Sequence, residues 1–193
     1  FSTARSAAGT AADDSGTSLA CELQGSGTAN EFQTFKRAIT LFDTSSLGAG
    51  ATISAATLEL YISGKFDEFT EKTNVHIVQS TPASNTALAS SDHNIGNWPT
   101  FADQATAINI ADLTTSAYNT WTLNATGLTN ISKISITKFG FITGFDYSNT
   151  SPTYNGVQSA SATSNSADGA NLPKLNVTYS PSSSDDLYGY GEF

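Results

Sequence analysis

Apolar and polar residues alternate with a period of two along much of the chain, and this alternation predicts β-strands. The clearest cases are residues 31–42 and 53–63, which flank a connection rich in glycine and serine. In the second of these segments Leu58, Leu60 and Ile62 lie on the same side of an extended chain. Both segments therefore predict strands with one buried face and one more polar face.

Similar but shorter patterns predict the remaining strands. They lie at residues 19–25, 74–80, 105–113, 118–125, 136–147 and 172–180. Residues 126–133 indicate a short helical turn, because Leu128 and Ile131 have i,i+3 spacing. Residues 148–170 carry turn signals and little apolar pattern, so they predict a long loop or a weak edge strand.

The predicted elements favour one fold class. No long stretch has the 3.6-residue apolar period of an amphipathic helix. Short strands joined by long loops predict an all-β protein, an antiparallel β-sandwich of the jelly-roll type with at most one short helical turn. The 193 residues suffice for one sizeable domain. We expect a low-complexity arm at 1–18, flexible unless a partner orders it, a single sandwich domain at 19–180, and a tail or linker at 181–193.

Composition narrows the classes of partner. The net charge of −9 disfavours electrostatic capture of phosphates, so we expect no nucleic-acid partner. No apolar run approaches the roughly 18 residues of a membrane helix, and we expect no membrane insertion. Cys21 is the single cysteine, which rules out an intrachain disulfide. Methionine is absent even at position 1, so we expect a processed product or a fragment.

Motifs for catalysis are missing. The two histidines, His76 and His93, belong to no H-E-x-x-H pattern, and the chain has neither a G-x-S-x-G elbow nor a P-loop. The carboxylates of residues 65–73 lie between two predicted strands, where a solvated hairpin tip is favoured over a glycosidase pair. We therefore expect a protein that is not an enzyme.

The connection at residues 81–104 is the best place to look for a ligand, because long loops of β proteins often carry binding surfaces. The candidate glycan or partner contacts, one of which is a strand residue, are Asp92, His93, Trp98 and Tyr118. Aromatic faces can stack on sugar rings. The favoured alternative is that Trp98 and Phe101 close one end of the core.

The tail after Pro181 combines a polar spacer with aromatic residues separated by glycine. One interpretation is a linker to a further domain. The other is a segment that pairs with a neighbouring subunit by strand addition. The candidate subunit contacts in it are Leu187, Tyr188, Tyr190 and Phe193.

Three segments, in order along the chain, carry a family resemblance. They are FKRAITLFDTSSLGAGATISAATLELYISG, YNTWTLNATGLTNI and ADGANLPKLNVTY. Together they resemble the opening strand pair, the tryptophan strand with its turn, and the closing strand of DNRLRE-type modules. The resemblance covers roughly residues 20–180. These modules are related in fold to the calcium-binding carbohydrate modules of the jelly-roll class.

Similar modules occur in bacterial surface proteins and in structural proteins of tailed phages. The resemblance implies a non-enzymatic structural or interaction subunit of an extracellular assembly, such as a virion decoration, a tail or fibre component, or a surface filament protomer. Its partners would be copies of itself or other surface or virion proteins. Its location would be a virion, a filament or a cell surface. The alternative is a carbohydrate-binding or calcium-stabilised adhesion module with glycan ligands.

Calcium is the one cofactor that this resemblance brings forward. Asp13 and Asp14 precede the first strand, about where such a site lies in the carbohydrate modules, and Asp168 precedes the last strand. Calcium takes about six to eight oxygen ligands. A solvated acidic surface is the favoured alternative for these carboxylates.

Overall fold

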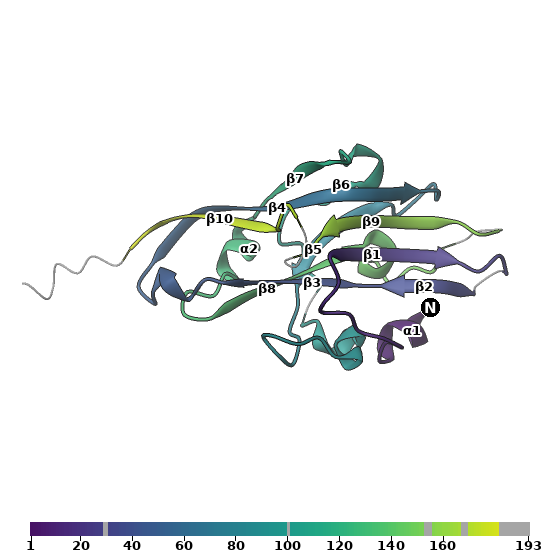
Figure 1. Ribbon diagram of the computed structural model, residues 1–193, viewed down its shortest axis with the longest axis horizontal. Helices are drawn as coiled ribbons and strands as arrows, with labels where there is room; N and C mark the ends of the chain where they lie inside the picture. The colour runs from purple at the N-terminus through teal and green to yellow at the C-terminus, as the bar shows by residue number, and fades with distance from the viewer. Residues whose placement is uncertain (29–30, 100, 153–155, 167–169, 182–193) are drawn as a thin grey trace, which may run out of the picture.

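The computed structural model describes residues 1–28, 31–99, 101–152, 156–166 and 170–181. These residues form two antiparallel β-sheets that run along the long axis of the molecule (Figure 1). The prediction of an all-β antiparallel sandwich is therefore confirmed. The jelly-roll arrangement of its strands stays a prediction.

The larger sheet has six strands and contains the longest strand of the described chain. Its members are β1 (Ser18–Gly25), β2 (Phe32–Lys36), β4 (Thr52–Asp67), β7 (Ala117–Thr122), β9 (Ser159–Asn165) and β10 (Lys174–Ser180). Within β4, residues 57–59 pair with both β10 and β7, whereas Ile62 pairs with both β7 and β9. Strands β10 and β9 therefore follow one another along the same side of β4.

The smaller sheet has four strands in the order β3-β8-β5-β6. They are β3 (Ala38–Asp43), β5 (Asn74–Gln79), β6 (Ile108–Asn109) and β8 (Ile136–Thr143). The described chain also contains α1 (Ser2–Ser6), α2 (Ala125–Thr129) and α3 (Gly144–Tyr147), together with the 3-10 turns η1 (Ser45–Leu47), η2 (Ser90–His93), η3 (Ile95–Asn97) and η4 (Ile110–Asp112). Helix α2 overlaps the helical turn that was predicted at 126–133. Helices α1 and α3 were not predicted, since at most one short helical turn was expected.

Two apolar clusters divide the molecule into three layers. The main cluster lies between the sheets, and its largest fully buried side chains are Trp121, Phe139, Phe141 and Phe145. A second cluster contains Val78, Trp98 and Ile142. Since Trp98 belongs to the long loop, this cluster packs that loop against the outer face of the smaller sheet.

Strand β9 corrects the prediction for residues 148–170. The segment was expected to be a loop or a weak edge strand, but β9 pairs with β1 on one side and with β4 on the other. Its sequence, SASATSN, lacks large apolar residues, and Ala160 and Ala162 are fully buried. The bulk of the adjacent core comes instead from the aromatic residues of other strands, so β9 shows no hydrophobic alternation.

Two other predicted strands are shorter than expected. Residues 105–113 form only the two-residue β6 followed by η4, because the Asn109 side chain accepts a hydrogen bond from the Ala111 N–H at 2.8 Å and caps the turn. Residues 136–147 form β8 as far as Thr143 and then turn into α3. The apolar alternation predicted both strands too long, because it gives no sign of the side-chain cap or of the short helical turns that end them.

The buried Cys21 supports a prediction about the integrity of the sandwich. Cys21 lies in β1 opposite Ala162 of β9, and burial raises the pKa of its thiol to about 12. We expect a thiol reagent at mildly alkaline pH to modify it at least about a hundredfold more slowly in the folded protein than in guanidinium chloride. The Cys21→Ser variant gives the background signal. Rapid labelling of protein that retains its circular dichroism spectrum would contradict this burial.

Candidate functional site

Arg37 is the residue at which the chain passes from one sheet to the other. It lies between β2, which pairs with β1 in the larger sheet, and β3, which pairs with β8 in the smaller one. Its Nε and Nη2 atoms donate to Oδ2 and Oδ1 of Asp146 at 2.6 and 2.8 Å. Both side chains are only 1% exposed. Because Asp146 belongs to α3, directly after β8, this bidentate pair fixes the crossing to the end of its neighbouring strand.

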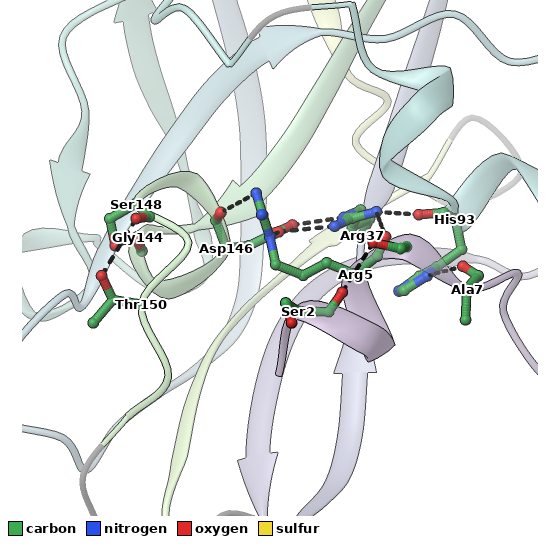
Figure 2. A network of polar contacts seen from close by, with 10 residues as sticks. Ser2, Arg5, Ala7, Arg37, His93, Gly144, Asp146, Ser148 and Thr150 are labelled. Atoms are coloured by element: carbon green, nitrogen blue, oxygen red, sulfur yellow. Dashed lines mark hydrogen bonds and ion pairs between the residues drawn. The ribbon is translucent and has the colours of Figure 1, made fainter.

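A second arginine approaches the same carboxylate from the N-terminal segment (Figure 2). Arg5 of α1 donates from Nε to Asp146 Oδ1 at 2.9 Å and from Nη2 to the Asp146 carbonyl at 2.8 Å. The ring of Phe1 stacks on that of Phe35, with 5.6 Å between the ring centres. Helix α1 is therefore held to the sandwich by both a buried ion pair and an aromatic contact.

This buried cluster holds two guanidinium groups and one carboxylate. Carbonyl groups compensate for part of the excess positive charge, because Arg37 Nη1 donates to the carbonyl oxygens of Arg5 and His93. Aromatic faces contribute as well, since the Arg37 guanidinium carbon lies 5.1 Å from the centre of the Phe35 ring and 5.5 Å from that of Trp98. Burial, followed by the charge of Arg37, lowers the pKa of His93.

The rest of the N-terminal segment is bonded to the long loop. The Gly9 N–H donates to the Ser90 carbonyl at 2.7 Å, and Asn94 Nδ2 donates to the Ser6 carbonyl at 2.5 Å. Residues 1–18 were expected to be flexible unless a partner ordered them. Within this chain the long loop and the buried Asp146 position the segment, and the sequence contained no local signal for either contact.

A groove of about 730 Å³ lies beside β3. It is lined by β3, by the first residues of β1, and by parts of the N-terminal segment and the long loop. Leu41 and Leu172 supply exposed apolar surface there, with 37% and 50% of their area accessible. Among the described residues, the backbone groups of β3 hydrogen-bond only to β8. The first half of β1, residues 18–21, likewise has no partner in β2.

Two of the candidate glycan contacts are buried. The Asp92 carboxylate accepts hydrogen bonds from the backbone N–H groups of Ala83 at 3.1 Å and Ala89 at 2.9 Å. Trp98 is 4% exposed, and its indole N–H donates to the Asp92 carbonyl at 2.9 Å. This corrects the expectation that both offer surface to a ligand. The burial of Trp98 agrees with the alternative in which it closes part of the core.

The other two candidates are separated from one another. His93 is half-buried at the groove, with its imidazole edge-on to Phe35 at 5.1 Å between ring centres. Tyr118 lies in β7 of the larger sheet and does not line the groove. Its hydroxyl donates to the Leu172 carbonyl at 3.1 Å, and the Lys174 ammonium lies 3.7 Å from its ring centre. The predicted contacts therefore do not form a single site.

The calcium candidates are engaged in local hydrogen bonds. Asp13 Oδ1 accepts from the Gly16 N–H at 2.8 Å, and Asp14 Oδ2 accepts from the Leu88 N–H at 3.0 Å. In the part of the chain that the structure describes, no group of three or more His, Cys, Asp or Glu residues could hold a metal ion. The remaining candidates lie outside the described residues: Asp168, Leu187, Tyr188, Tyr190 and Phe193.

One polar cluster was missed at the sequence level. His76 Nδ1 lies 2.7 Å from Asp103 Oδ1, and the ring of Tyr147 stacks on the imidazole with 3.9 Å between centres. Burial and the Asp103 charge raise the pKa of the Tyr147 hydroxyl. The contact with Asp103 orients the His76 imidazole. No motif connects these three residues in the sequence.

Comparison with protein-family models and with curated proteins finds no match for this chain. No helix among the described residues is long and apolar enough to cross a membrane. Functional inference therefore starts from the groove, the β3 edge and the buried cluster that supports them.

Proposed function

We propose that the protein is a non-enzymatic structural or interaction subunit of an extracellular assembly, such as a virion component or a surface filament. In this proposal it joins its neighbours through the edge of β3. The observation that supports it is the groove of about 730 Å³ beside a strand edge with no backbone partner among the described residues. The likeness to DNRLRE-type modules and the jelly-roll arrangement belong to the same proposal.

The sequence of β3 lacks the usual protection of an edge strand. Natural sheets block their edges with lysine, proline, bulges or covering segments. Strand β3 reads AITLFD, and its only charge is the terminal Asp43. Its pairing with β8 continues without a bulge from Ala38 to Asp43. An edge of this kind is suited to accept an additional strand.

The groove suits an extended peptide better than a small polar ligand. Backbone groups along β3 would supply hydrogen bonds, while the apolar surface of Leu41 and Leu172 would receive alternate side chains of the added strand. The Arg37–Asp146 pair holds the start of β3 in place. A rigid, preformed edge reduces the entropy that association costs.

The alternative of a carbohydrate-binding or calcium-stabilised adhesion module has weaker support. Trp98 is buried and its indole N–H is already bonded, so its face cannot stack on a sugar without rearrangement of the loop. Tyr118 and Tyr61 form an edge-to-face pair on the larger sheet, 5.4 Å between ring centres, and this pair offers the alternative an aromatic surface away from the groove.

Blocking the edge tests the proposal. We expect Leu41→Lys to weaken self-association of the purified protein at least about tenfold, because it places a charge on the receiving edge. Light scattering during size exclusion over a range of micromolar concentrations measures this. Ile134→Lys is the matched control, because Ile134 is 68% exposed and does not line the groove. A wild-type protein that stays monomeric, and that occurs in no particle or filament of its source, contradicts the proposal.

A further inference from the structure

The direction of β10 determines where the C-terminal segment leaves the sandwich. Strand β10 ends at Ser180, which pairs with Thr52 at the beginning of β4. Strand β3 ends at Asp43, and a short connection leads from it to the same Thr52. Both β3 and β10 therefore run toward the same end of the molecule (Figure 1). A chain that continues in the direction of β10 leaves its own molecule at that end.

Reaching the groove of its own molecule would require the segment to reverse its direction after β10. Pro181 follows β10 directly and has no backbone N–H, so it cannot continue the ladder with β4. After it the chain must turn back through about 180° to run beside β3. No such reversal is needed if a second copy lies beyond the end of β10. The direction of β10 therefore favours a neighbouring molecule over the same molecule as the acceptor.

The sequence after Pro181 has the composition of a spacer followed by a strand. Residues 182–186, SSSDD, are polar, and at about 3.3 Å per residue they span about 16 Å when extended. In the next part, Tyr188 and Tyr190 would occupy one face of an extended chain. The other face would carry Gly189 and Gly191 at its centre, with Leu187 and Phe193 at its ends. Glycine on one face permits close approach to a neighbouring backbone.

The tail is long enough to pair along the acceptor strand. Strand β3 has six residues, and the seven residues from Leu187 to Phe193 span about 23 Å when extended. The groove beside β3 offers the exposed surface of Leu41, while the tail offers aromatic and leucine side chains. Inserted there, the tail would cover the exposed surface of Leu41 with apolar side chains.

From these observations we infer that residues 182–193 of one molecule insert into the groove of a second copy and add a strand beside β3. This inference rests on the proposed function and names its partner. The donor and the acceptor are different surfaces of the same chain, so the contact is head-to-tail. Such a contact extends into rings or filaments, whereas two molecules that exchange their tails reciprocally close a two-fold dimer.

Two full-length variants test the inference by complementation. In the groove variant, Leu41→Lys blocks the acceptor and leaves the tail intact. In the tail variant, Leu187, Tyr188, Tyr190 and Phe193 are all replaced by serine, which removes the donor and leaves the groove intact. We expect each variant alone to be monomeric. Mixed in equal amounts, they should form a one-to-one complex of about twice the 20.1 kDa of one chain, which grows no further.

Thermal unfolding of both variants provides the folding control, because Leu41 is partly exposed and the tail lies outside the described sandwich. Leu172→Lys is a second groove variant, since Leu172 lines the groove and is half-exposed. Folded variants that fail to form the mixed complex overturn the inference.

The two proposals fail in different ways. If the tail variant assembles as the wild type does while the groove variants do not, the groove receives another segment, and only the inference about the tail is wrong. If the wild-type protein is monomeric throughout and its tail resists proteolysis, the tail occupies its own groove. That result overturns the head-to-tail contact and the self-association expected of the subunit.

Discussion

Asp146→Ala is expected to lower the free energy of unfolding by about 3–5 kcal/mol, because it removes the carboxylate shared by two buried arginines. Arg37 would lose two hydrogen bonds to the side chain, and Arg5 would lose one. Their charges would then lie close together without a counterion inside the protein. Such a penalty is a large fraction of the stability of a single domain.

Chemical denaturation followed by circular dichroism measures this loss. Glu22→Ala is the matched control, because it breaks an ion pair with Lys36 whose ammonium-bearing side chain is 53% exposed. Exposed pairs of this type contribute less than about 1 kcal/mol. A loss of similar size in both variants would show that the Asp146 cluster carries no special weight in the fold.

The same cluster shows what local sequence patterns cannot reveal. Arg37 and Asp146 are separated by 109 positions, and Arg5 and Asp146 by 141. Each residue taken alone reads as an ordinary surface charge, since buried charges are rare unless they are paired. Only the tertiary arrangement of β3, β8 and α1 brings them together. Residues 1–18 consequently looked like a low-complexity arm.

Where burial alternates along one strand, the sequence was informative. Strand β4 was predicted from Leu58, Leu60 and Ile62, and all three are buried. Strand β9 was missed because a central strand made of serine and alanine has no amphipathic pattern. The alternation of apolar and polar residues is therefore enough to predict the sandwich. The order of its strands is not predictable in this way, because the small residues of β9 are buried only by the strands that pack around them.

The candidate site was only partly visible in the sequence. The long loop was expected to carry Asp92, His93 and Trp98, and they do lie together there. Their roles differ from the expected one, because the loop packs its tryptophan inward against the smaller sheet. The groove lies where the chain stops pairing with β1 at the end of β2 and, after Arg37, pairs with β8 of the other sheet as β3. No motif encodes it.

Gly140→Ala is expected to destabilise the protein by about 3 kcal/mol, because β8 has no room for a methyl group at this position. A Cβ on residue 140 would lie 1.9 Å from Cζ3 of Trp98. The indole would have to move, and it would lose its hydrogen bond to the Asp92 carbonyl and its position over the Arg37 guanidinium. Because Trp98 lines the groove, the added methyl group would also alter the groove.

Gly64→Ala provides the comparison within the same fold. Gly64 lies in β4, a Cβ added to it would meet no other atom within 4 Å, and it needs no left-handed backbone conformation. Its replacement is expected to change the free energy of unfolding by at most about 0.5–1 kcal/mol in either direction. Denaturation of both variants, followed by tryptophan fluorescence, separates the two cases. Equal stabilities would mean that Trp98 does not pack on Gly140, and that the loop bordering the groove is held by other contacts.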